Sequence, residues 1–224
     1  MQLHGRLQKV PLGIGIEEHL SAVYHTTMQL DDCFAYTKSE MGIYDEAAFD
    51  VELTDWTPIA SRPYNQSFAD SMFAREEVQG LKECGIIEDC ISPWSFPSLI
   101  VHRQVGEEDK RRLVVDFRAL NERTIGDAFP MPDCDFVLSL LSRAGYYATL
   151  DLKSGFWQVG LTDRAKECCV FVTKEGQYRF LRMAFGLKNA PAFFQRMMTR
   201  ILGPLIGQIC LVYIDDVVIW GNTP

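Results

Sequence analysis

The sequence contains no run of about 18 uncharged apolar residues, the minimum that a membrane-spanning helix requires. Its first residues, MQLHGRLQKVPLG, also lack the continuous apolar stretch of a secretory signal peptide. These two absences argue against an integral membrane protein and against a secreted one. We therefore expect no membrane partner, and a cytoplasmic or nuclear location.

Cysteine and histidine do not occur in the spacings that metal sites or disulfide scaffolds use. The seven cysteines are an odd number without a Cys-x-x-Cys, and the four histidines form no pair at helical spacing. A chain of 224 residues is long enough for one or two domains around a hydrophobic core. Reduced thiols in a cytosolic or nuclear setting are therefore the simplest interpretation.

An excess of basic residues is also missing, since the net charge is −8. The acidity is uneven: residues 1–60 hold 3 Lys and Arg against 10 Asp and Glu, whereas residues 61–224 hold 19 against 20. The near-neutral part can still carry a local basic surface for nucleic acid, although the whole chain is no polycation. We interpret residues 1–60 as an acidic leader or linker and residues 61–224 as the folded domain.

Hydrophobic periodicity and turn residues predict a mixed α+β domain with antiparallel hairpins in place of βαβ units. The expected helices lie around 16–24, over 67–84 with Gly85 as its stop, over 130–145 with Asp133 as its cap, and over about 191–205. The expected strands pair 98–102 with 113–117 across a polar loop at 104–111, pair 168–173 with 178–183, and occupy 146–151 and both halves of 209–220.

The segment LVYIDDVVIW at 211–220 places Asp215 and Asp216 side by side in an otherwise apolar stretch. Aspartate is common in turns, so one interpretation is a hairpin turn with two solvated acids. A second segment, ATLDLKSGFWQV at 148–159, ends an apolar run at Asp151, and two such strand ends could converge. Three clustered carboxylates repel one another, and Mg²⁺, which prefers oxygen ligands, would remove that cost. Two such ions about 4 Å apart support nucleotidyl transfer.

Five segments occur in the order and spacing of one known family. YIDD at 213–216 resembles the Tyr-x-Asp-Asp box of reverse transcriptases, and LDLKSGFWQV at 150–159 resembles the segment with their first catalytic aspartate. The other three are similar to the segment upstream, the fingers strand and the stretch beside the incoming nucleotide: SPWSFPSLIV at 92–101, RRLVVDFRALNERT at 111–124 and FLRMAFGLKNAPAFFQRMM at 180–198. The residue sequences AFGLKNAP and DFRALN resemble those of the gypsy-like polymerases of LTR retrotransposons.

The resemblance implies a right-hand polymerase with fingers and palm subdomains and an antiparallel palm sheet packed against helices. It implies that Asp151, Asp215 and Asp216 hold two Mg²⁺ ions, or Mn²⁺ in their place, with the Leu152 carbonyl as a further ligand. The implied activity is that of an RNA-directed DNA polymerase, which adds deoxynucleotides to a primer on an RNA or DNA template. The implied partners are the primed template and deoxynucleoside triphosphates.

The resemblance also implies contacts to the triphosphate of the incoming nucleotide. Arg112, four residues before Asp116, matches an arginine with this role, and Lys110 is a second candidate. Either could instead be a surface charge, and Lys110 falls in the expected polar loop. The backbone N–H groups of Ser154 and Gly155 would approach the triphosphate at a turn of small residues.

Phe156, five residues after Asp151, matches an aromatic side chain below the sugar, where its ring would clash with a 2′-hydroxyl. It should favour deoxynucleotides, which argues against an RNA-synthesising polymerase. Phe185 stands where retroviral enzymes carry glutamine, and it could be a nucleotide contact or a packing residue. The candidates for primer or template contacts are Tyr213, Ile214, Gln158 and Trp94. Gln158 could instead make a hydrogen bond within the palm, and Trp94 could be a core residue.

Segments that follow this region in the family are not found in the sequence. These are the thumb, RNase H and integrase, which we expect as partners within a longer Pol polyprotein, in a cytoplasmic virus-like particle or the nucleus. We therefore expect a reverse transcriptase domain truncated after the YIDD motif. The alternative is a non-catalytic remnant that binds at most nucleic acid or a partner chain. The missing thumb favours the remnant, and the three intact aspartates favour the enzyme.

Overall fold

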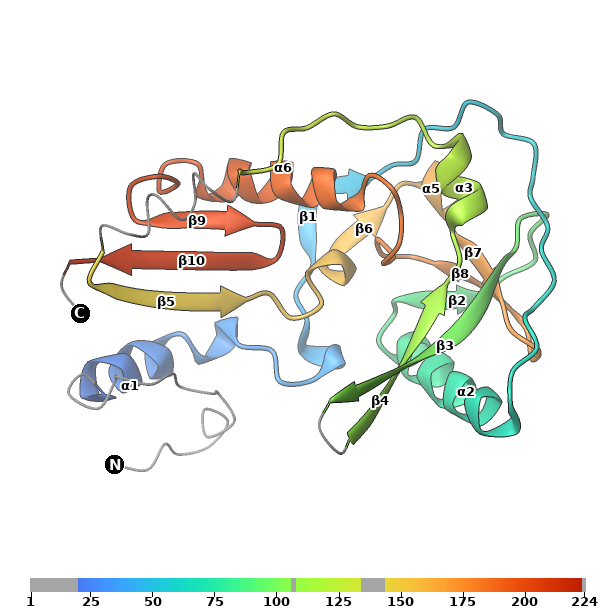
Figure 1. Cartoon of the computed structure of the whole chain (residues 1–224), viewed down its shortest axis with the longest axis horizontal. Helices are drawn as coiled ribbons and strands as arrows, with labels where there is room; N and C mark the ends of the chain where they lie inside the picture. The colour runs from blue at the N-terminus through green and yellow to red at the C-terminus, as the bar shows by residue number, and fades with distance from the viewer. Residues whose placement is uncertain (1–19, 106–107, 134–143, 223–224) are drawn as a thin grey trace.

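The computed structural model describes residues 20–105, 108–133 and 144–222, which form three sheets with helices around them (Figure 1). The strands are β1 (Tyr44–Phe49), β2 (Ile87–Asp89), β3 (Phe96–Val105), β4 (Glu108–Val115), β5 (Tyr146–Asp151), β6 (Val159–Leu161), β7 (Val170–Val172), β8 (Gln177–Phe180), β9 (Cys210–Tyr213) and β10 (Asp216–Gly221). The α-helices are α1 (Leu20–Gln29), α2 (Phe68–Glu83), α3 (Arg118–Arg123), α5 (Asp163–Cys168) and α6 (Ala190–Leu202). The 3-10 helices are η2 (Asp31–Cys33), η3 (Lys38–Glu40) and η4 (Gly155–Gln158).

The largest sheet has the strand order β2-β8-β7-β3-β4 and contains both predicted hairpins. The β3–β4 hairpin is confirmed, and it is longer than expected, because its register continues to Val105 opposite Glu108. The prediction of a loop over 104–111 is therefore wrong. The side chains of 101–104 and 109–112 are exposed, so this end of the hairpin is a ribbon whose polar residues remain in water. A parallel pairing of β3 with β7 joins the two hairpins, which the sequence pattern did not predict.

Helix α2 forms where the sequence predicts it, because a capping residue marks its start and a glycine marks its end. The Ser67 side chain accepts a hydrogen bond from the backbone N–H of Asp70, which caps the first turn. Gly85 follows the helix with a φ of 64°, a left-handed conformation that glycine adopts without strain. The buried residues of α2 are Ala74, Val78 and Leu81.

The second sheet is antiparallel with the strand order β5-β10-β9, as the expected strands at 146–151 and 209–220 require. Helix α6 runs alongside it (Figure 1), and Pro191 lies in the first turn of the helix, where its missing N–H has no intrahelical partner to lose. All six residues of the edge strand β5 are exposed. The helix expected over 130–145 lies largely outside the described residues.

The segment 44–53, which we expected to belong to a leader, packs with the rest of the domain. Strand β1 pairs in parallel with β6, and Phe49, Val51 and Leu53 are buried in the core. Composition hides this role because the core residues alternate with Asp50 and Glu52, so only one side of the segment is acidic. The division of the chain at residue 60 stays a prediction, but a leader ending there would include part of the core.

The described part of the chain contains no helix that is both long enough and apolar enough to cross a membrane. Its six cysteines are free thiols, and Cys168, Cys169 and Cys210 are buried. Burial raises the pKa of the Cys210 thiol, which keeps it protonated and unreactive at neutral pH. Cys168, Cys169 and Cys210 therefore act as small apolar residues of the core.

Candidate active site

Three aspartates from two separate segments meet at one end of the three-stranded sheet. Strand β5 ends at Asp151, and β10 begins at Asp216, which lies directly opposite Asp151 in the antiparallel register. The backbone N–H of Leu152 donates a hydrogen bond to the carbonyl of Asp215 at 3.0 Å, which ties the end of β5 to the β9–β10 turn. The structure thus brings the three carboxylates together, while their catalytic role stays a prediction.

The carboxylates influence one another electrostatically. Burial raises the pKa of Asp151, the negative charges of Asp215 and Asp216 raise it further, and Lys153 lowers it. As the side chains stand, no three His, Cys, Asp or Glu residues of the described chain are grouped to hold a metal ion. The donor set is nevertheless the all-oxygen set that Mg²⁺ prefers, and the exposed Asp151 and Asp216 side chains have room to turn towards an ion. The residues therefore have the chemistry to bind a divalent cation, but their side chains are not arranged as a preformed coordination site.

The β9–β10 turn contains a strained residue directly before the first of the paired aspartates. Ile214 has a φ of 57°, in the left-handed region that β-branched residues rarely adopt. Such a conformation costs about 1–3 kcal/mol and persists only where the surroundings impose it. Tyr213 is 44% exposed beside this turn, and Ile214 is half-buried. Their predicted contacts with a primer end stay predictions.

The turn after β5 is shaped by close packing against α6. Ser154 has a φ of 47°, and a Cβ added at Gly155 would lie only 2.7 Å from Cζ of Phe194. Glycine is therefore the residue that fits between this turn and the helix. The short helix η4 starts at Gly155 and places the ring of Phe156 at 5.4 Å from that of Phe194.

Two of the groups that we predicted as ligands are bonded to each other. The N–H of Gly155 donates to the carbonyl of Leu152 at 3.2 Å, which closes the turn. The structure uses this N–H to close the turn, and the predicted contacts of Ser154 and Gly155 with a triphosphate stay predictions. The Leu152 carbonyl keeps a second lone pair for a metal ion.

Aromatic side chains gather around η4, the short helix that follows the carboxylate end of β5. The rings of Phe156 and Phe185 are 5.2 Å apart, and that of Trp157 makes an edge contact with Phe185 at 5.3 Å. Phe185 is 47% exposed, so it both packs and presents a surface. The structure thus joins the two predicted nucleotide contacts from segments almost thirty residues apart in the chain.

The loop that carries Phe185 is held by Asn121, which the motif patterns did not single out. The side chain of Asn121 donates to the carbonyl of Gly186 at 2.8 Å and accepts from the N–H of Lys188 at 2.8 Å. Gly186 has a φ of 89°, so the chain bends sharply between these two bonds. Asparagine has a low propensity for helices such as α3. Its presence there was the one local feature of the sequence that indicated a role other than helix formation.

The two predicted basic contacts lie on the other sheet. Arg112 and Lys110 are exposed residues of β4, opposite Val101 and Arg103 of β3. Lys110 is therefore part of a strand, and not of the expected loop. Their predicted contacts with a triphosphate stay predictions.

Comparison with known proteins places this geometry in a family. Residues 103–224 match the family model described as reverse transcriptase (RNA-dependent DNA polymerase). The chain belongs to the reverse transcriptase family. It is 36% identical over 200 residues to the Pol polyprotein from transposon gypsy of Drosophila melanogaster, covering 88% of this chain and 19% of that protein. It is 32% identical over 222 residues to the enzymatic polyprotein of soybean chlorotic mottle virus, covering 98% and 31%. This reverse transcriptase chain thus spans less than a third of these relatives.

Solved reverse transcriptases share the fold. The prototype foamy virus protease–reverse transcriptase superposes with a TM-score of 0.82 at 21% identity, covering 97% of this chain and 28% of that one. The expected fingers and palm arrangement is therefore confirmed. The five-stranded and the three-stranded sheets of this reverse transcriptase chain both belong to that shared fold.

Two predicted template contacts of this reverse transcriptase chain have intramolecular partners. Trp94 is 4% exposed, and its ring makes an edge contact with Trp56 at 6.2 Å. Trp94 is thus part of the hydrophobic core, which is the alternative that we left open, and its predicted contact with a template stays a prediction. Gln158 donates from Nε2 to the carbonyl of Lys153 at 3.0 Å, which is the alternative hydrogen bond within the palm.

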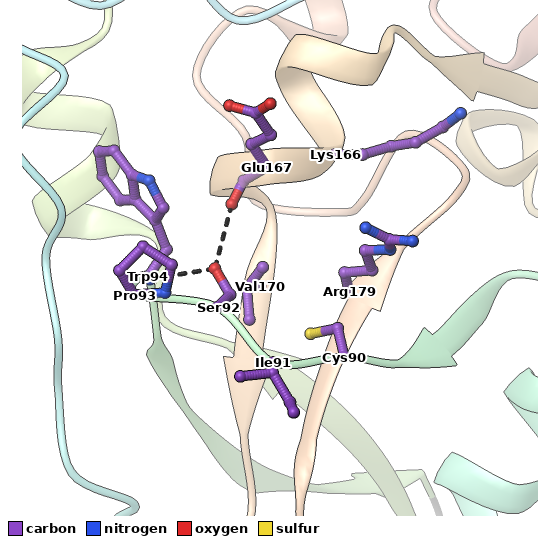
Figure 2. Close-up of a pocket in the computed structure, with 9 residues that line it drawn as sticks. All are labelled: Cys90, Ile91, Ser92, Pro93, Trp94, Lys166, Glu167, Val170 and Arg179. Carbon is purple, nitrogen blue, oxygen red and sulfur yellow. Dashed lines mark hydrogen bonds between the residues drawn. The ribbon is translucent and has the colours of Figure 1, made fainter.

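A cavity of about 180 Å³ lies beside Trp94, and none of the three aspartates is among the residues that line it (Figure 2). The Ser92 hydroxyl donates to the carbonyl of Glu167 and accepts from the N–H of Trp94, so it fixes one wall. The two basic residues of the lining, Lys166 and Arg179, each pair with a carboxylate outside the lining. Their charges are therefore balanced, and the cavity offers no strong anion site.

Proposed function

We propose that this chain is the fingers-and-palm part of an RNA-directed DNA polymerase that adds deoxynucleotides to a primer on an RNA or DNA template. The observation that carries the proposal is the pairing of Asp216 with Asp151 across two strands, in a chain of the reverse transcriptase family. Three carboxylates that repel one another destabilise a fold unless a ligand neutralises them. A remnant that only kept the fold would gain nothing from retaining all three.

The carboxylates are proposed to hold two Mg²⁺ ions, with Mn²⁺ as an alternative. Asp151, Asp215 and Asp216 would be the ligands, and the Leu152 carbonyl would be a further one. Bound ions of this kind activate a primer hydroxyl and stabilise a leaving pyrophosphate. The chain itself contributes the placement: the β5–β10 register fixes Asp216 opposite Asp151, and the bond from Leu152 to Asp215 fixes the turn. Burial and the charges of Asp215 and Asp216 raise the pKa of Asp151, and the repulsion among the three carboxylates also favours cation binding.

The aromatic residues support selection of deoxynucleotides. The ring of Phe156 contacts the rings of Phe185 and Phe194, at centroid distances of 5.2 and 5.4 Å. A ring in contact with two others cannot easily move away, so it would exclude a 2′-hydroxyl from the sugar position. Arg112 and Lys110, on the exposed ribbon of the fingers, would supply positive charge for the triphosphate, together with the Ser154 N–H.

Primed nucleic acid is the proposed partner. Related solved structures include the foamy viral protease–reverse transcriptase in complex with an RNA/DNA hybrid and with double-stranded DNA. We propose the same class of ligand here, with Tyr213 and Ile214 close to the primer end. Because the relatives are several times longer, thumb, RNase H and integrase segments of a Pol polyprotein are proposed as further partners.

Primer extension tests the proposal. The chain is incubated with a primed RNA template, deoxynucleoside triphosphates and Mg²⁺, beside the Asp215→Asn variant. Asp163→Asn is the matched control, since the side chain of Asp163 is 99% exposed on α5. We expect extension by the parent and by Asp163→Asn, and none by Asp215→Asn.

A second arm separates a missing duplex grip from a missing active site. The segment that follows the YIDD motif in the gypsy relative is appended to the parent and to both variants. Extension that depends on Asp215 in the longer chain supports the proposal even where the short chain is inactive. A folded longer chain that binds primed template and never extends it would show that the catalytic assignment is wrong.

A further inference from the structure

Helix α6 buries a polar side chain directly behind the carboxylate turn. Gln195 is 3% exposed, and its neighbours on the helix include the buried Phe194, Met197 and Met198. An amide in such surroundings is costly unless its polar atoms are bonded. Leucine or methionine would fill the same space at no such cost, so the hydrogen bonds that Gln195 makes require an explanation.

Both polar ends of the amide bind the β9–β10 turn. Nε2 of Gln195 donates to the carbonyl of Val212 at 3.1 Å, and the N–H of Ile214 donates to Oε1 at 2.8 Å. The two bonds lie on either side of Tyr213, so one side chain fixes the backbone at two points two residues apart. An amide offers one acceptor and one group of donors, so a single orientation satisfies both bonds.

The residue that receives this support is the strained one. Ile214 keeps a φ of 57° only if its surroundings impose it, and the bond to its N–H is the contact that can do so from the helix side. Asp215 follows at once, and its carbonyl accepts from the N–H of Leu152 at 3.0 Å. Gln195 therefore acts one peptide away from the paired carboxylates, and the same turn is tied to β5 on its other side.

We propose that Gln195 is a positioning residue, whose amide holds the Ile214 turn and thereby fixes Asp215 and Asp216 against Asp151. The expected effect on catalysis rests on the proposed polymerase function, whereas the expected effect on the conformation of the Ile214 turn does not. Without the amide, Ile214 can relax to negative φ, and the carboxylates then lose their fixed placement relative to Asp151. Misplacement of catalytic groups by about 1 Å lowers a rate by roughly a hundredfold.

Three variants separate the amide bonds from simple packing. Gln195→Met keeps the length of the side chain and removes both bonds. Gln195→Glu keeps an acceptor for the N–H of Ile214 and loses the donor to Val212. Met198→Leu is the matched core control on α6, because Met198 is 6% exposed and has no bond to the turn.

The first readout is hydrogen exchange at the backbone N–H of Ile214, which does not depend on activity. We expect protection in the parent, in Gln195→Glu and in Met198→Leu, and loss of protection in Gln195→Met. The second readout is primer extension, measured in the short chain or, if that chain is inactive, in the chain extended by the appended segment. We expect Gln195→Met to lower kcat by about 10- to 100-fold and to raise the Mg²⁺ concentration for half-maximal rate, with KM for the deoxynucleotide little changed.

The outcomes distinguish the two proposals. Protection of Ile214 that survives in Gln195→Met overturns the structural inference. If Gln195→Met loses the protection of Ile214 while kcat and the Mg²⁺ dependence stay unchanged, the inferred effect on catalysis is wrong. It is also wrong if Met198→Leu lowers kcat as much as Gln195→Met does. If neither the chain nor its extended form is active while Ile214 depends on Gln195 for protection, the proposed function fails and the structural inference stands.

Discussion

Replacing Gly155 by alanine tests how tightly the turn after β5 packs on α6. The new Cβ would lie 2.7 Å from Cζ of Phe194 and 3.3 and 3.4 Å from its two Cε atoms. Phe194 is 1% exposed, and its ring is also in contact with Phe156, so it has little room to move away. Overpacking of this kind costs about 1–3 kcal/mol of the free energy of unfolding. In a chain of this size the cost lowers Tm by roughly 2–12 °C.

The measurement is thermal and urea unfolding, followed by circular dichroism in buffer without divalent metal. Gly160→Ala is the matched control, since nothing lies within 4 Å of the Cβ that it would add. We expect its effect on the free energy of unfolding to stay within about 0.5 kcal/mol.

A double-mutant cycle checks the cause of the loss. Phe194→Leu removes the ring atoms that meet the new Cβ, so Gly155→Ala should cost less in that background. An equal cost in both backgrounds, or no cost in the parent, would refute the packing argument.

Two further predictions concern the fingers and the nucleotide. His102 bridges Asp109 and Asp70, with a nitrogen–oxygen distance of 2.9 Å to each, and these hydrogen bonds raise the pKa of His102. Its charged form therefore stabilises the fold fully below the ordinary pKa of about 6.5 and loses that effect as pH rises through the raised value. His102→Gln should destabilise the chain in urea unfolding at about pH 5.5 and much less at about pH 8.5, and equal effects would contradict the linkage. Phe156→Val should raise the use of ribonucleotides relative to deoxynucleotides in primer extension on the order of tenfold, and an unchanged ratio would remove Phe156 from the sugar contact.

Signals that act within a few residues predicted their elements well. Ser67 and Gly85 mark the ends of α2 because a cap and a left-handed stop depend on local backbone geometry. Pro191 marks the start of α6 for the same kind of reason. The paired aspartates stood out because carboxylates are rare in apolar strands. The sequence by itself therefore determined the family, most of the strands and helices, and the three carboxylates.

Only the tertiary structure decided which distant residues support those carboxylates. The alternating residues Phe49 and Val51 were hidden by an acidic composition, because burial depends on pairing with β6 more than a hundred residues away. The bonds that Asn121 and Gln195 make to remote backbone groups have no local pattern, since they depend on where a helix meets a loop or a turn. The burial of Trp94 likewise depends on distant residues, among them Trp56, whose ring contacts it. Sequence spacing specifies the chemistry of such a site, and long-range packing specifies its geometry.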